Sequence, residues 1–183
     1  MPRSSTVHAI VLKRTSFGEA DLIVTFYSQE LGKVVALAKG VRKISSRRAS
    51  SLEPAMYGKY ALINGKAINT LTETQIIKNL GPSEPDLANL TRTQQVLEII
   101  DLLTVDHEPN STVFDLLKSS LLLIRAGTLT KTVFLENIRL VLQALGFTHD
   151  KQFSERGLKE YVEELANKKL KTKSFLTIPQ ARG

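Results

Sequence analysis

The sequence GKVVALAKGVRKISSRRASSLE occupies residues 32–53 and joins a predicted β-strand to a strongly basic loop. The strand covers Lys33–Lys39, and the loop opens at Gly40. Serines and other small residues separate the charges of the loop, so its side chains can spread along an extended polyanion such as a nucleic-acid backbone. A solvated loop that keeps a sheet edge soluble is the alternative. Between Glu30 and Glu53 there is no acidic residue, whereas the basic residues are Lys33, Lys39, Arg42, Lys43, Arg47 and Arg48.

Four more strands are predicted around this one, at residues 5–14, 21–28, 56–63 and 67–77. In the central strand Val34, Ala36 and Ala38 share one face, and the mixed opposite face predicts a bulge or a covered outer side. Asn64-Gly65 is a strong hairpin signal. Five short strands with a long loop between the third and fourth predict a small closed barrel such as an OB-fold, and a small open sandwich is the main alternative.

The hydrophobic period becomes helical after Leu80-Gly81-Pro82-Ser83. Ser83 and Asp86 are predicted to form a capping box for a helix that ends near Asp106. Three further helices are predicted from Asn110 to Gly127, from Lys131 to Gly146 and from Ser154 onward. The apolar face of the first is expected to include Leu87, Leu90, Leu97 and Ile100.

The predicted fold class is therefore α+β with two domains: an OB-fold β-barrel in residues 1–82 and a helical bundle with a basic tail in residues 83–183. The 183 residues have a net charge of +7. Residues 1–83 contribute +7, residues 84–164 contribute −5, and residues 165–183 contribute +5. This distribution indicates a basic first domain, an acidic second one and a basic end.

The composition argues against several classes of function. The chain has no cysteine, which excludes disulfides, cysteine nucleophiles and thiolate zinc sites. Neither a signal peptide nor a long apolar stretch is recognisable, so a cytoplasmic protein is expected. Phosphate-loop, serine-hydrolase and zinc-protease motifs do not occur, and we expect no enzyme, no small-molecule substrate and no cofactor. The adjacent residues Asp106, His107 and Glu108 do not converge well on one ion, so no metal site is expected.

Aromatic residues of the predicted barrel are candidates for stacking on unpaired bases. Packing between strands or in the core is the favoured interpretation for each of Phe17, Tyr27, Tyr57 and Tyr60. Tyr57 shares a strand face with Lys59 and is the preferred candidate for an exposed ring that contacts DNA.

The first part of the chain resembles the opening of the RecO family of bacterial recombination mediators. The matching pieces are the strand IVLKR, the GEAD turn at Gly18–Asp21, the ELGK connection, the AKGVRK segment and the LEP that closes the basic loop. The helical part resembles the family more loosely, through a bundle of similar length and the stretch KLKTKSFL at Lys169–Leu176.

This resemblance implies an OB-fold followed by a helical domain. It also implies binding of single- and double-stranded DNA, annealing of complementary strands, and loading of RecA onto strands coated by single-strand binding protein (SSB). The implied partners are RecR, on the OB-fold side, and the acidic C-terminal tail of SSB, on the helical domain. The residues implied to contact DNA are Lys39, Arg42, Lys43, Arg47 and Arg48.

The chain departs from the family pattern at one place. Many members have a four-cysteine zinc module after the third long helix, whereas residues 146–153 (GFTHDKQF) here connect the helices directly, with no cysteine. Because residues 84–164 are net acidic, the SSB tail is expected to need a local basic cluster. That cluster is predicted to be Lys168, Lys169, Lys171 and Lys173.

Two classes of function follow from the sequence. The first is a DNA-binding mediator of strand annealing in DNA repair and recombination, located in the cytoplasm with the nucleoid. The second is an OB-fold adaptor that acts mainly through protein partners and binds nucleic acid weakly. An RNA-binding module is a more distant third, because phosphate contacts alone do not distinguish RNA from DNA.

Overall fold

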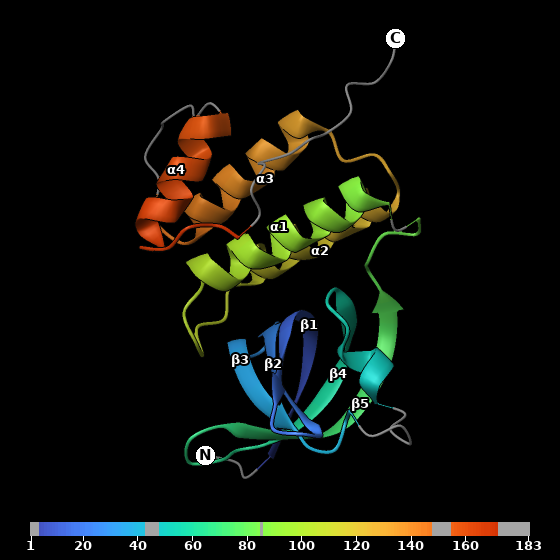
Figure 1. The fold of residues 1–183 in the computed structure, drawn as a ribbon. Helices are drawn as coiled ribbons and strands as arrows, with labels where there is room; N and C mark the ends of the chain where they lie inside the picture. Colours follow the sequence, from blue (N-terminus) through green and yellow to red (C-terminus); the bar gives the residue numbers. More distant parts are fainter. Residues whose placement is uncertain (1–3, 43–47, 85, 148–154, 172–183) are drawn as a thin grey trace.

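A computed structural model describes residues 4–42, 48–84, 86–147 and 155–171, and it consists of a β-sheet domain followed by helices (Figure 1). The five strands are β1 (Ser4–Phe17), β2 (Asp21–Ser28), β3 (Gly32–Ala38), β4 (Met56–Ile63) and β5 (Asn69–Asn79), with a short 3-10 helix at Ala49–Leu52. They pair in the closed order β1-β2-β3-β5-β4, with β4 returning to β1. All pairs are antiparallel except β3 with β5, which is parallel. The predicted small closed sheet is therefore confirmed.

The interior of the barrel is apolar because alternate residues of each strand point inward. In β3 the inward residues Val34, Ala36 and Ala38 are fully buried, whereas the outward ones are half-buried, as the sequence predicts for a covered outer face. The bulges lie elsewhere, between β1 and β2 and between β4 and β5. Tyr60 and Phe26 fill the centre with their ring centroids 4.6 Å apart.

Four helices follow: α1 (Leu87–Leu103), α2 (Ser111–Arg125), α3 (Lys131–Ala144) and α4 (Glu155–Leu165). Asn110 caps α2 as predicted, because its side chain accepts a hydrogen bond from the Val113 N–H. Gly127 and Gly146 adopt positive φ just after α2 and α3, which confirms them as helix stops. The predicted start of the last helix at Ser154 lies outside the described residues.

The start and end of α1 differ from the prediction. Asp86 alone caps the helix, accepting the Asn89 N–H at 2.6 Å, while the Ser83 hydroxyl donates to the Arg125 carbonyl. The helix ends at Leu103, and the Thr104 hydroxyl donates to the Ile100 carbonyl. The predicted capping box and the helix end near Asp106 were therefore wrong.

The apolar face of α1 is as wide as predicted, since Val96, Ile99 and Leu103 are buried, but it is shorter at the N-terminal end. Leu97 and Ile100 are buried, but Leu87 and Leu90 are exposed, since they precede the part of the helix that packs on the barrel. Phe17 is likewise 52% exposed, because β1 runs beyond the barrel as far as this residue instead of ending near Arg14. Its predicted packing role was therefore wrong.

One hydrophobic core joins the barrel to the helices. Outward-facing Ile10, Leu12 and Tyr27 of the barrel pack with buried residues of all four helices. Helices α1 and α2 lie next to the barrel in Figure 1, and α3 and α4 form the layer beyond them. The interior of the barrel is a second, separate core.

Candidate nucleic-acid interface

The basic loop begins at the end of β3, where the backbone turns sharply. Gly40 has a positive φ of 67°, and its N–H donates to the Asp21 carboxylate at 2.8 Å. The next turn is held by the Arg42 N–H, which donates to the Ala20 carbonyl at 2.9 Å. Lys39 and Arg42 are both exposed, as a polyanion-binding role requires. Lys43 and Arg47 lie outside the described residues.

Arg48 has a different environment from the other basic residues of the loop. Its guanidinium donates to the Thr72 carbonyl of β5 at 3.2 Å and to the Lys39 carbonyl at 3.0 Å, and the residue is half-buried. These bonds tie the returning chain to the barrel. Arg48 therefore holds the loop in place, and its contact with DNA remains a prediction.

Tyr57 lies at the opposite end of the barrel from this loop. Its ring meets Phe114 of α2 edge-on, with centroids 6.1 Å apart, and the Lys118 ammonium lies 4.6 Å from the ring centroid. Lys39 lies at the far end of β3, about 20 Å along the strand from the residues that touch the helices. Tyr57 is half-buried and packs against the core that joins the barrel to the helices, so the predicted exposure of its ring was wrong. The structure also does not bring Tyr57 together with the basic loop, and base stacking on it stays a prediction.

A cavity of about 380 Å³ opens beside the basic loop. Arg14 of β1 is opposite Val24 of β2, and Ser16 is opposite Leu22, so both extend the inner face of the sheet beyond the closed barrel. Neither Arg14 nor Ser16 was predicted to be a site residue, because Arg14 ends the predicted strand at residues 5–14 and Ser16 lies beyond that strand. The lining residues are Arg14, Ser16, Leu22, Val41, Arg42 and Ala49.

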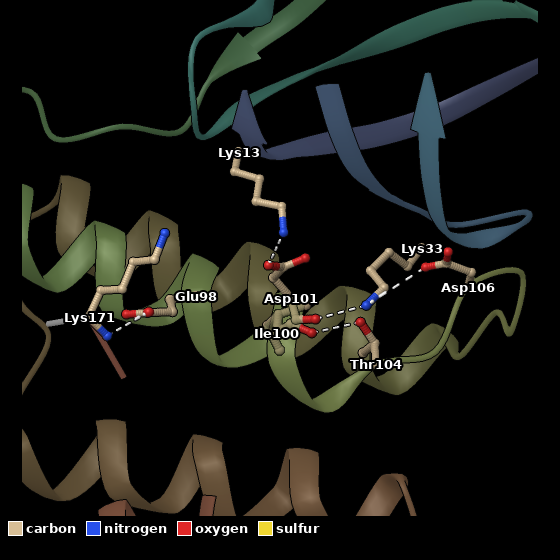
Figure 2. Close-up of polar contacts among 8 residues, drawn as sticks. All are labelled: Lys13, Lys33, Glu98, Ile100, Asp101, Thr104, Asp106 and Lys171. Carbon is tan, nitrogen blue, oxygen red and sulfur yellow. Dashed lines mark hydrogen bonds and ion pairs between the residues drawn. The ribbon is translucent and has the colours of Figure 1, made fainter. Parts of the chain in front are cut away.

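The barrel is fixed to α1 by two lysines, one from β1 and one from β3 (Figure 2). Lys13 of β1 donates to the Asp101 carboxylate at 2.5 Å. Lys33 of β3 donates to the Asp101 backbone carbonyl at 2.8 Å, and its ammonium lies 3.8 Å from the Asp106 carboxylate. These cations lie near the C-terminal end of α1, where the helix dipole favours positive charge. They set the position of the barrel against the helices.

The predicted C-terminal lysine cluster is only partly brought together. Lys169 is paired with the Glu163 carboxylate at 2.8 Å, which lowers the pKa of Glu163, and the Leu170 N–H donates to the same carboxylate. Lys168 and Lys171 border a cavity of about 310 Å³. Lys173 lies outside the described residues. The cavity is lined by Leu12, Lys13, Gln94, Leu97, Glu98, Asp101, Leu102, Lys168 and Lys171, and the Lys171 N–H donates to Glu98 at its edge.

Tyr27 and Tyr60 are buried as predicted, and they make stability sensitive to high pH. Burial is the largest cause that raises the pKa of Tyr27 to about 12, and burial also raises the pKa of Tyr60. In the unfolded chain both phenols ionise near their ordinary pKa of 10.

The free energy of unfolding is therefore expected to fall as the pH rises from about 10 to about 12, because the unfolded state loses these protons first. The Tyr27→Phe variant should show a shallower fall in this range, measured by urea unfolding. An equally steep fall in the variant would contradict the prediction for Tyr27.

Within the described part of the chain, each helix is too short or too polar to cross a lipid bilayer. The same residues contain no group of three or more His, Asp or Glu side chains arranged to hold a metal ion. Asp106 faces Lys33, and the His107 N–H donates to the Lys33 carbonyl, so this segment is part of the contact between barrel and helices.

Comparison with known proteins agrees with the resemblance drawn from the sequence. Residues 1–80, which form the barrel and the basic loop, match the family described as Recombination protein O N terminal. These residues belong to the RecO family. The relatives named DNA repair protein RecO from Shouchella clausii and Heliobacterium modesticaldum are each 33% identical to the chain, over 119 and 141 residues.

The similarity to RecO extends into the helices but not over the full length of the relatives. The two alignments cover 65% and 76% of this chain, but only 46% and 50% of those relatives. A RecO protein of Bacillus pumilus is 31% identical over 119 residues. The chain thus spans about half the length of the curated relatives that it matches.

Proposed function

We propose that this protein acts in DNA repair and recombination as a mediator that binds single- and double-stranded DNA, anneals complementary strands and helps to load RecA onto SSB-coated DNA. The observation that carries the proposal is the match of residues 1–80 to the N-terminal domain of Recombination protein O. The same residues present Lys39 and Arg42 to solvent at the start of the basic loop.

The barrel is proposed to be an OB-fold. Five strands in the closed order β1-β2-β3-β5-β4, with a long connection between β3 and β4, support this assignment. OB-folds bind single strands with a positively charged groove and sequence-tolerant contacts. Binding by this barrel is accordingly expected to depend little on base sequence.

The mechanism is electrostatic. Two complementary strands repel each other, and a basic loop lowers the repulsion by neutralising phosphates and releasing counterions. No catalytic residue, cofactor or small-molecule substrate is needed for this process. The protein is proposed to work in the cytoplasm, on the DNA of the nucleoid.

The proposed protein partners are RecR, on the barrel side, and the acidic C-terminal tail of SSB, on the helical domain, with RecA as an indirect partner. The cavity between β1 and α1 supports the SSB contact, since Lys168 and Lys171 border an apolar floor that includes Leu97 and Leu102. Acidic Glu98 and Asp101 line the same cavity, but Asp101 is already paired with Lys13.

The test is binding of a fluorescent oligothymidine, about 30 nucleotides long, measured by anisotropy over a salt series. Five phosphate contacts give an expected slope of about −3.5 in log affinity against log salt. A variant with Lys39, Lys43 and Arg47 changed to glutamine should flatten the slope to about −1.4. Arg48 is kept in this variant, because its loss would release the loop from β5.

The matched control has Lys66, Lys78 and Lys131 changed to glutamine, so it loses the same charge at exposed positions away from the loop. Its slope should stay near that of the natural protein. Equal salt slopes for both variants would mean that the DNA contacts lie outside the basic loop. No binding by any of the proteins would favour the adaptor that works through protein partners.

A further inference from the structure

We propose that the cavity beside the basic loop is a seat for one nucleotide of a bound single strand, and that Glu53 restrains it by occupying Arg14. This inference rests on the proposed binding of DNA and deepens it. It adds Arg14 and Ser16 as contacts with the nucleotide, and it gives Glu53 the role of opposing DNA binding.

The shape of the cavity fits a group that is apolar on one side and anionic on the other. Leu22 and Val41 are 6% and 1% exposed and form an apolar floor. Arg14, Ser16 and Arg42 provide the polar side, from β1 and from the start of the basic loop. The volume of about 380 Å³ lies within the range of small-ligand sites. A base can rest on the floor or against a guanidinium plane while its phosphate meets the arginines.

The two arginines are held in different ways. The Arg42 guanidinium donates to the Gly18 carbonyl at 3.2 Å, which fixes it against the turn between β1 and β2. An arginine has five N–H donors, so this bond leaves others for a phosphate. Arg42 is therefore oriented in advance for an anion.

Arg14 is held by an anion of the protein itself. Its guanidinium lies 2.6 Å from the Glu53 carboxylate, and the two side chains are 34% and 44% exposed. A pair this exposed contributes little to stability and is open to exchange with a solvent-borne anion. A phosphate that enters the cavity competes with Glu53 for Arg14, so Glu53 lowers the affinity for DNA.

The test is a double-mutant cycle on Arg14 and Glu53, with the oligothymidine as the probe. The Arg14→Gln variant should bind about tenfold more weakly, as expected for the loss of a charge-assisted contact to phosphate. The Glu53→Gln variant should bind about threefold more tightly, because it frees Arg14. In the Arg14→Gln background, Glu53→Gln should change the affinity no more than Glu73→Gln does.

Glu73 is the matched control, since it is an exposed acidic residue of β5 in the same barrel. Equal gains from Glu53→Gln and Glu73→Gln would show a general charge effect and overturn the restraint by Glu53. Equal affinity for an abasic strand of the same length would overturn the seat for a base. Displacement of the strand by an equal concentration of thymidine monophosphate would mean a site for free nucleotides and would overturn the link to the strand.

The cycle distinguishes this inference from the proposed function. If the natural protein binds the strand and the basic-loop variant binds it more weakly, the proposed DNA binding is supported, regardless of the result for the Arg14→Gln variant. If the Arg14→Gln variant then binds as the natural protein does, only the nucleotide seat is overturned. If the natural protein does not bind the strand at all, the proposed function fails first.

Discussion

The Gly32→Ala variant is expected to lose about 3 kcal/mol of stability, because two independent costs coincide at this position. Gly32 has a positive φ of 67°, a backbone conformation that residues with a Cβ rarely adopt. An added Cβ would also lie 2.2 Å from the Glu108 carbonyl oxygen. That oxygen belongs to the backbone of the segment between α1 and α2, so it can move away only if the helices shift on the barrel.

The control for this prediction is Gly18→Ala. Gly18 has a similar positive φ of 57°, but a Cβ there would have no atom within 4 Å. Only the conformational cost applies, and a loss of about 1 kcal/mol is expected. Urea unfolding followed by far-UV circular dichroism measures both variants. Equal losses would mean that the contact between Gly32 and Glu108 does not constrain the protein.

The Phe114→Ala variant is expected to lose about 3–5 kcal/mol, as is typical when a large aromatic side chain is removed from a core. Phe114 is 2% exposed, and it lies in the core that joins α2 to the barrel. Its ring also meets Tyr57 of β4. The cavity left by the variant would therefore open at the contact between the domains, and both should lose stability together.

Phe147→Ala is the matched control, since Phe147 is 38% exposed and its removal should cost less than about 1 kcal/mol. The chain has no tryptophan, and three of its four tyrosines lie in the barrel, so near-UV circular dichroism of a Tyr161→Phe background follows the barrel while the far-UV signal follows mainly the helices. A barrel transition that stays unchanged in Phe114→Ala would show that the domains unfold independently.

Local patterns were enough to predict most of the secondary structure. The bounds of β2 and β4 agree with the prediction because their alternation and flanking turns are unambiguous. The cap at Asn110 could be predicted because the capping side chain and its partner, the Val113 N–H, are only three positions apart in the sequence. The end of β1 was misplaced, since the strand continues through Thr15 and Ser16 without a hydrophobic alternation to reveal it.

The candidate site was predicted less completely, because its parts meet only in three dimensions. The charges at Lys39 and Arg42 are visible as a run in the sequence, and both are exposed. Arg14 reaches the same place from a different strand, and no local spacing relates it to Arg42. The role of Arg48 also depends on a distant partner, the carbonyl of Thr72 in β5.

The closure of the barrel has a consequence for the order of folding. Ser4 pairs with Ile63, and Ala36 pairs with Asn69, so the sheet closes only when distant parts of the chain meet. Helices α1 and α2 are neighbours in sequence and can meet early, whereas pairing over long separations is slow. Their shared core nevertheless needs Ile10, Leu12 and Tyr27 of the barrel. The helices follow the barrel in the sequence, yet they cannot complete their packing until β1 has paired with its neighbouring strands in the barrel.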